Sequence, residues 1–213
     1  MIYSGVESSL LEAGKLFEIT ISRREQLIKE SREVISISAK SIVCIHNSKF
    51  DDAKKLQKLA IRKLEDLREI AGADMVRYIF PSEQELVECS VVLALSTGAD
   101  IPSRKQLKVE NSSYILGILD AIGELKRIVY DTIRNSDFEK AERLFSIMQQ
   151  LYLLVSPFSI YDHVAQGVKR KLDVARILIE DTRGTVTEEA RRRELINAVG
   201  RLSLQLDRQL KAN

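Results

Sequence analysis

The sequence predicts an all-α protein, an elongated bundle of about seven helices, and three observations support this prediction. Only 3 prolines and 9 glycines occur among the 213 residues. The stretches between them are rich in Leu, Ile, Ala, Glu, Lys and Arg, which are mostly good helix formers. Apolar residues recur in these stretches at helical intervals. We therefore expect one helical domain over residues 1–213, because no shift in composition marks a boundary.

Three helices are predicted in the first half of the chain. Residues 7–46 keep a helical period, as one very long helix or two nearly continuous ones. An amphipathic pattern over residues 50–70 stops at Gly72, as is common where helices end. After a proline, residues 82–97 form the third helix, which Gly98 closes.

Four more helices are predicted after a loop over residues 99–110. Asn111 can cap the first of them, and Asp137 or Ser136 can cap the second. Gly184 separates the last two. The four predicted helices span residues 111–135, 137–155, 160–183 and 185–210.

Charge and cysteine content limit the class of protein. The formal net charge is +2 with 30% charged residues, so any nucleic-acid site must be a local basic patch. Cys44 and Cys89 lie in apolar contexts, and the sequence has only 2 histidines and no CxxC or HExxH spacing for zinc. No run of about 18 apolar residues is evident. We expect a cytoplasmic protein without membrane segments and with both cysteines in the core.

Two acidic pairs lie on predicted helices, each pair on one helix face. They are Glu85 with Glu88, and Asp120 with Glu124. Glu88 and Asp120 each lie nine residues from the near end of their helix (97 − 88 and 120 − 111), or about 14 Å. If the two helices pack antiparallel, four carboxylates converge, which requires a cation or raised pKa values. Such oxygen ligands suit Mg²⁺ or Mn²⁺, which can activate water against a phosphodiester.

A structural interpretation of the same acids stays open. Ser82 and Glu85 match a capping box, in which Glu85 reaches back to the helix start. Glu124 and Arg127 have the spacing of a surface ion pair. Asp120 is the hardest to explain in this way, because its sequence neighbours are apolar.

Two glycines flank Asp120 on its helix. Gly117 and Gly123 lie three residues before and three residues after it. They either let a backbone or a phosphate group approach closely or serve helix packing.

Basic side chains follow helical spacing on the first predicted helix. Lys29, Arg32, Ser36 and Lys40 share one face, which is either a solvated surface or a phosphate-binding one. Phosphate contacts of this kind bind RNA with little sequence preference and a strong salt dependence.

The stretch VENSSYILGILDAIGELKRIVYDTIRNSDFEKA resembles the central segment of the translin and Trax family. In that segment a tyrosine, an apolar-Gly pair, an Asp, a Gly-Glu-Leu, a basic residue and an Asn-x-Asp recur in order. Here these are Tyr114, Leu116-Gly117, Asp120, Gly123-Glu124-Leu125, Arg127 and Asn135-Ser136-Asp137. QELVEC at 84–89 and LIKESREVISISAKSIVCIH at 27–46 are similar to Trax in particular. The resemblance covers roughly residues 23–184, and residues 185–213 are expected to form an additional C-terminal helix.

This resemblance implies a seven-helix fold whose subunits assemble side by side into a hollow octameric barrel. It implies binding of single-stranded or short structured RNA, or of single-stranded DNA, through Arg32, Lys40 and Arg127. In the Trax branch it implies a Mg²⁺-dependent endoribonuclease. The family's catalytic and metal-binding acids map onto Glu85, Glu88, Asp120 and Glu124. A homo-oligomer is the simplest assembly, and a translin-like partner subunit is the alternative.

Three functional hypotheses follow. The first is a Mg²⁺- or Mn²⁺-dependent endoribonuclease, and the second is a translin-like RNA- or DNA-binding protein whose acids are structural. The third is a helical scaffold without a nucleic-acid role, which the near-neutral charge allows. Patterns alone favour the scaffold, whereas the family resemblance favours the nuclease.

Overall fold

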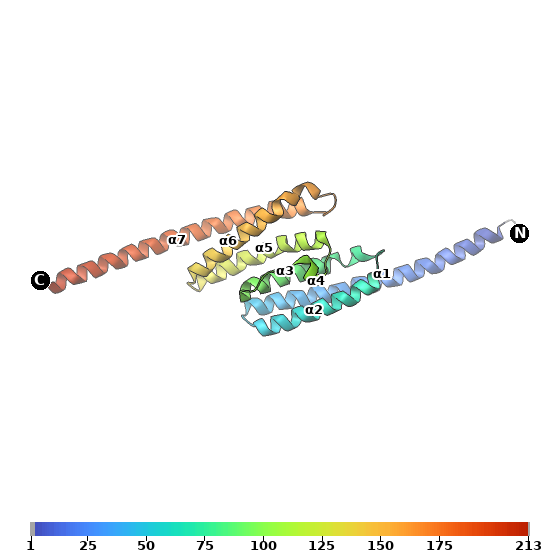
Figure 1. The fold of residues 1–213 in the computed structure, drawn as a ribbon, viewed down its shortest axis with the longest axis horizontal. Coiled ribbons are helices and arrows are strands. Elements are labelled where there is room, and N and C mark those ends of the chain that lie inside the picture. Colours follow the sequence, from blue (N-terminus) through green and yellow to red (C-terminus); the bar gives the residue numbers. More distant parts are fainter. Residues whose placement is uncertain (1–2, 213) are drawn as a thin grey trace. The chain divides into compact units, whose positions relative to one another are not determined.

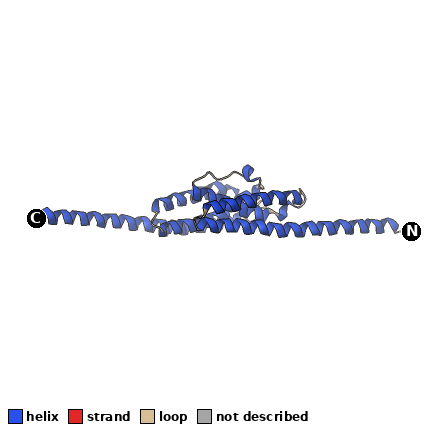
Figure 2. Cartoon of the chain, turned by 90° about the horizontal axis from the view of Figure 1, so that it is seen from below, coloured by secondary structure: helices blue, strands red, loops and turns tan. Residues whose placement is uncertain are grey.

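The computed structural model describes residues 3–212, and these residues form helices and turns without a strand (Figure 2). The all-α prediction is therefore confirmed. The helices are α1 (Ser4–His46), α2 (Phe50–Ala71), η1 (Val76–Tyr78), α3 (Phe80–Thr97), α4 (Arg104–Leu107), α5 (Asn111–Arg134), α6 (Phe138–Val155), η2 (Ser156–Tyr161) and α7 (Val168–Ala212). They form two compact units that meet within α5, one ending at Ala121 and the other beginning at Ile122. One domain over residues 1–213 stays a prediction.

The first unit is built on an antiparallel pair of helices, α1 and α2 (Figure 1). The α1 segment is one continuous helix, which decides between the two expectations for residues 7–46. Ser41 Oγ donates to the Ala53 carbonyl at 2.9 Å, and Arg23 donates to the Ala71 carbonyl at 3.2 Å. Packing α3 against this pair completes the core, because apolar side chains of all three helices lose their contact with water. The fully buried ones include Leu27, Val34, Leu64, Leu67, Leu86, Val87 and Val91.

The connection between α3 and α5 is more ordered than predicted. Gly98 ends α3 in the left-handed conformation, with φ +69°, as expected for a glycine after a helix. The loop then contains α4, which the sequence analysis missed. Gln106 N–H donates to Ser103 Oγ at 3.3 Å, while Ser103 N–H donates to Gln106 Oε1 at 2.7 Å. This reciprocal capping box stabilises a helix of only one turn.

The second unit comprises the end of α5 with α6, η2 and α7. Asp137 caps α6 by accepting a hydrogen bond from Lys140 N–H at 3.2 Å, as predicted. The predicted break at Gly184 is wrong, because α7 continues through it (Figure 1). Within the described part of the chain, residues 185–212 therefore do not form a separate helix. A glycine inside a helix costs only about 1 kcal/mol, which the long helical segments on both sides outweigh.

The segment Phe138–Tyr161 is long and apolar enough to cross a membrane by length and composition alone, and 22% of its apolar 18-residue window is buried in the protein. Core helices of soluble proteins also meet these two conditions. Within the second unit, α6 buries Phe138, Leu144, Met148 and Val155. The absence of membrane segments thus stays a prediction.

Candidate functional site

The two helices that carry the predicted acids run parallel in the first unit. Glu110, just before α5, donates its N–H to Glu83 Oε2 near the start of α3 at 3.0 Å. Further along both helices, a Cβ placed on Gly117 falls 2.6 Å from the Gln84 carbonyl oxygen and 2.7 Å from Val87 Cβ. The antiparallel packing on which the convergence of the four carboxylates was conditional is therefore not found. The cause is the connection over residues 98–110, which returns the chain to the start of α3 before α5 begins.

The parallel arrangement still places two of the predicted acids, Glu88 and Asp120, at one level of the first unit, with Glu85 one turn earlier on α3. Asp120 lies one turn beyond Gly117, and Glu88 lies one turn beyond Gln84, which Gly117 contacts. Since both helices advance in the same direction, Asp120 stands level with Glu88. All three acids, Glu85 included, are half-buried.

Glu124 and Arg127 follow Asp120 on α5 but belong to the second unit. Glu124 is half-buried and Arg127 is exposed. Between them, Lys126 forms an ion pair with Asp181 of α7, and a hydrogen bond in this pair raises the pKa of Lys126 and lowers that of Asp181. This ion pair links the second half of α5 to α7 within the unit.

The capping-box interpretation of Glu85 is wrong. The α3 helix begins at Phe80, with Pro81 in its first turn, so Ser82 lies inside the helix. Its hydroxyl donates to the Ile79 carbonyl at 2.7 Å. Glu85 is therefore not at the position from which a capping glutamate reaches the helix start.

The negative charges of Glu85 and Glu88 affect the pKa of the neighbouring Cys89 thiol. The pKa of Cys89 is raised to about 12, chiefly by burial; a hydrogen bond with Ser41 opposes this rise, and the negative charges of Glu88 and Glu85 add to it. The thiol is buried, as the sequence predicted, and stays protonated at neutral pH. Cys89 is therefore a core residue in a negative field and not a nucleophile.

The predicted carboxylates are suitable ligands for a hard divalent cation, but they are not arranged as a complete metal-binding site. Among the described residues, no group of three or more His, Cys, Asp and Glu side chains is placed to hold a metal ion. Carboxylate oxygens are nevertheless the ligands that Mg²⁺ and Mn²⁺ prefer. Mg²⁺ usually binds through one or two carboxylates together with substrate phosphates and several waters, so it does not need a complete set of protein ligands.

Replacing Gly117 by alanine is expected to lower the free energy of unfolding by about 1–3 kcal/mol, because the new Cβ overlaps a backbone carbonyl and Val87 of α3. The matched control is Gly123→Ala, where the nearest atom to a new Cβ is Leu178 Cδ1 at 3.9 Å. That change should be neutral or stabilising, since alanine favours helix. Urea unfolding of both variants measures the difference, and equal midpoints would contradict the close contact.

The basic residues predicted to contact nucleic acid lie on the surface. Arg32 and Lys40 are exposed, two helical turns apart on α1. The buried residues Leu27 and Ile45 lie on the opposite face of the helix. Nothing in the first unit covers either cation, so the α1 face is open to a phosphate backbone.

A second basic cluster was missed, because its members are far apart in sequence. The guanidinium groups of Arg24 and Arg77 lie 5.5 and 5.0 Å from the centre of the Tyr78 ring. Hydrogen bonds from Arg77 and Arg24 lower the pKa of Tyr78. Arg23, by contrast, is held by Asp74 at 3.0 Å. Only the fold brings residue 24 beside residues 77 and 78, and the sequence shows no periodicity that predicts it.

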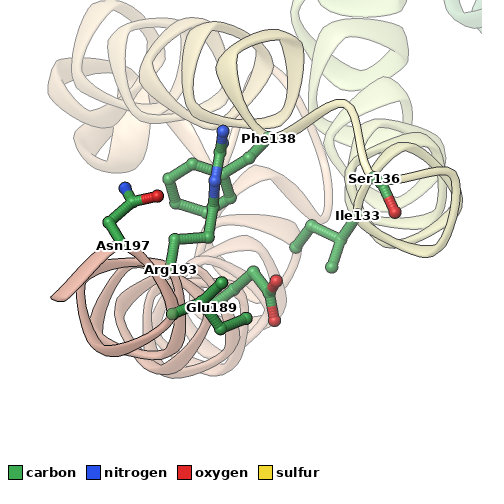
Figure 3. A pocket seen from close by; sticks show the side chains of 7 residues that line it. Ile133, Ser136, Phe138, Glu189, Arg193 and Asn197 are labelled. Atoms are coloured by element: carbon green, nitrogen blue, oxygen red, sulfur yellow. The ribbon is translucent and has the colours of Figure 1, made fainter. Parts of the chain in front are cut away.

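A pocket of about 300 Å³ lies in the second unit (Figure 3). It contains one acid, Glu189, and one base, Arg193, whose guanidinium lies 4.9 Å from the centre of the Phe138 ring. None of the predicted site residues lines it. The lining residues are Ile133, Ser136, Phe138, Glu189, Arg193, Ile196 and Asn197.

A comparison of this chain with known protein families identifies its family. The model of the translin family matches residues 74–180, which include α3 and α5 and so all four predicted acids. This chain belongs to the translin family. The uncharacterised protein MJ0175 of Methanocaldococcus jannaschii is 34% identical over 169 residues, which cover 78% of this chain and 75% of that protein.

Solved structures show the translin-family fold as well. AfC3PO in complex with duplex RNA is 30% identical with a TM-score of 0.78, over 87% of this chain and 98% of that one. AfC3PO in a second crystal structure is 31% identical with a TM-score of 0.79, over the same shares of the two chains, 87% and 98%. Apo-NeC3PO is 19% identical with a TM-score of 0.74, over 84% and 96% of the two chains, and is similar in fold alone.

Proposed function

We propose that this translin-family protein is a Trax-type, Mg²⁺-dependent endoribonuclease that binds single-stranded RNA or short structured RNA. The observation that carries the proposal is the level placement of Glu88 and Asp120 on parallel helices, fixed by the close contact at Gly117. The similarity to AfC3PO, whose structure with duplex RNA is known, supports RNA as the ligand.

The four acids share one role in this proposal, which is to hold the cation. Glu85, Glu88 and Asp120 hold the cation, and Glu124, one turn beyond Asp120, adds a fourth carboxylate from the same helix. When bound, Mg²⁺ or Mn²⁺ supplies a Lewis acid that activates water and stabilises charge on the phosphodiester. The half-buried carboxylates orient the attacking water and accept its proton.

RNA contacts follow from the exposed cations. Arg32 and Lys40 on α1 and Arg127 on α5 bind phosphate oxygens, which positions the strand without reading its sequence. Single-stranded DNA offers the same phosphates, so we expect it to bind as well. The assembly is a homo-oligomer, by analogy an octamer, in the cytoplasm.

The test compares the wild-type protein with Mg²⁺ and with EDTA on a labelled single-stranded RNA, a short RNA duplex and the matching DNA. We expect cleavage of RNA only with the metal, and binding of the DNA. Mn²⁺ binding, followed by electron paramagnetic resonance, should be weak alone and tighten when uncleavable RNA is added. RNA binding without cleavage would instead indicate a binding protein or a missing partner subunit, and no RNA binding would indicate a scaffold.

Replacing Arg32 and Lys40 together by glutamine should weaken RNA binding by about 10- to 100-fold, since two charge-assisted hydrogen bonds to phosphate are lost. The slope of log affinity against log salt should fall by about 1.4 for single-stranded RNA. Fluorescence polarisation across a salt series measures both quantities. The matched control, Lys54→Gln with Lys58→Gln, removes two exposed charges from α2 and should leave the slope near that of the wild type. Equal effects of the two pairs would exclude the α1 face.

A further inference from the structure

The pocket of the second unit lies between the α5–α6 connection and α7 (Figure 3). Its volume of about 300 Å³ is at the lower end of the range for small-molecule sites. Ile133, Ser136 and Phe138 line it from the end of α5 to the start of α6, and α7 supplies the other lining residues. No residue predicted to cleave or bind RNA lines this pocket, so it takes no part in the cleavage proposed above.

Arg193 brings into this pocket a positive charge that no acid of the described chain neutralises. The residue is half-buried, and its guanidinium lies 4.9 Å from the centre of the Phe138 ring. Arg192 forms an ion pair with Glu189, three residues earlier, whereas the residue three before Arg193 is Ala190. Within residues 3–212 the Arg193 guanidinium forms neither a hydrogen bond nor an ion pair. A guanidinium stays charged at neutral pH and has five N–H donors, so this one is available to an anion.

Glu189 lies one helical turn before Arg193 but does not pair with it. A glutamate four residues before an arginine commonly forms an ion pair across the turn. Here Glu189 Oε2 lies 3.2 Å from Arg192 Nη1 instead. Figure 3 shows Arg193 extending toward Phe138 and Glu189 pointing in a different direction. A carboxylate accepts several hydrogen bonds, so Glu189 can still accept one from a ligand.

The remaining lining determines which anion fits. Ile133, Phe138 and Ile196 supply apolar surface beside the two charged groups. A suitable ligand therefore has a negative group, an N–H donor close to it and an apolar portion. An α-amino acid with an apolar side chain carries all three on one carbon atom. A phosphate ester fits less well, because its second negative charge has no second unpaired cation here and is repelled by Glu189.

We propose that this pocket binds a free α-amino acid with an apolar side chain. The carboxylate of the ligand accepts hydrogen bonds from Arg193, whose planar fork matches a carboxylate. The ammonium group of the ligand donates to Glu189, and the side chain packs against Ile133, Phe138 and Ile196. The ligand is thus recognised by both of its charges and by its apolar side chain.

Isothermal titration calorimetry on the full chain tests the ligand class. We expect L-leucine and L-phenylalanine to bind with one site per chain. Isocaproate lacks the amine of leucine and leucinamide lacks its carboxylate, so each should bind at least about 10-fold more weakly than leucine. Inorganic phosphate and guanosine monophosphate should bind more weakly still. Absence of amino-acid binding, equal binding of isocaproate, or preferred binding of either phosphate compound would overturn the proposal.

Pocket variants test the location of the site. Arg193→Gln and Glu189→Gln should each weaken leucine binding by about 10- to 100-fold, since each removes a charge-assisted hydrogen bond. Arg191→Gln is the matched control, because Arg191 is exposed on the same helix, pairs with Glu188 and does not line the pocket. The control should bind leucine as the wild type does, and circular dichroism should show equal helix content in all variants. Unchanged affinity in both pocket variants would exclude this pocket, whatever the outcome for RNA cleavage.

Discussion

The double replacement Asp120→Asn with Glu124→Gln is expected to reduce Mg²⁺-dependent RNA cleavage by about 10²–10⁴-fold, the contribution of a well-placed acid–base group. Both changes keep the shape of the side chain and remove its negative charge. The variant loses ligands for the cation and a group that accepts the proton of the attacking water. RNA affinity should stay equal or rise, because two charges that repel phosphate are gone.

The measurement follows cleavage of a labelled RNA under single-turnover conditions, together with Mn²⁺ binding by electron paramagnetic resonance. Asp66→Asn with Glu69→Gln is the matched control, since it removes one exposed Asp and one exposed Glu from α2. The control should cleave at the wild-type rate. Cleavage that persists in the Asp120 and Glu124 variant, at unchanged Mn²⁺ affinity, would remove these acids from the site.

Helix boundaries were predictable where a local chemical signal sets them. Gly98 ends α3 because a glycine takes the left-handed conformation at low cost, and Asp137 begins α6 by capping a free N–H group. At Gly184 the predicted helix end is not found, because a glycine within a long helix lowers helix stability only slightly when no turn competes with the helix. Such residues mark a helix end only if the chain has a reason to turn there.

The direction of helix packing was not predictable from periodicity. Spacing shows that Glu85 and Glu88 share a face, but it does not show whether α5 runs along α3 or against it. The connection decides this direction, and the sequence predicts a loop where the capping box of Ser103 and Gln106 forms a short helix. Glu88 and Asp120 nevertheless share one level in the parallel arrangement, so the candidate site rests on different geometry from that predicted.

The buried pair of Arg68 and Glu83 was missed for a similar reason, since nothing local in the sequence distinguishes Glu83 from a solvated acid. Glu83 is only 1% exposed, and Arg68 Nη2 lies 3.3 Å from its Oε1. The second carboxylate oxygen accepts the Glu110 N–H, while Arg68 also donates to the Leu107 carbonyl. One carboxylate therefore joins α2, α3 and the start of α5.

Replacing Glu83 by glutamine is expected to lower the free energy of unfolding by about 3–5 kcal/mol, because the partly buried Arg68 charge loses its partner. The corresponding fall in Tm is roughly 6–20 °C. Thermal unfolding by circular dichroism measures it. Glu65→Gln is the matched control, since it removes the same charge from an exposed pair with Lys108 at 2.8 Å, and water already screens that pair. The control should have nearly the same Tm as the wild-type protein.

The expected effect on RNA cleavage distinguishes Glu83→Gln from the double replacement of Asp120 and Glu124. Glu83 holds the start of α5 beside the start of α3 by accepting the Glu110 N–H, seven residues before Gly117, which meets Gln84 and Val87. If this tether sets the level of Asp120 against Glu88, the folded Glu83→Gln protein should bind RNA normally but cleave it more slowly. Raising the Mg²⁺ concentration should restore part of the rate, since the carboxylates themselves remain. A normal cleavage rate at a lowered Tm would show that Glu83 stabilises the fold without positioning the acids.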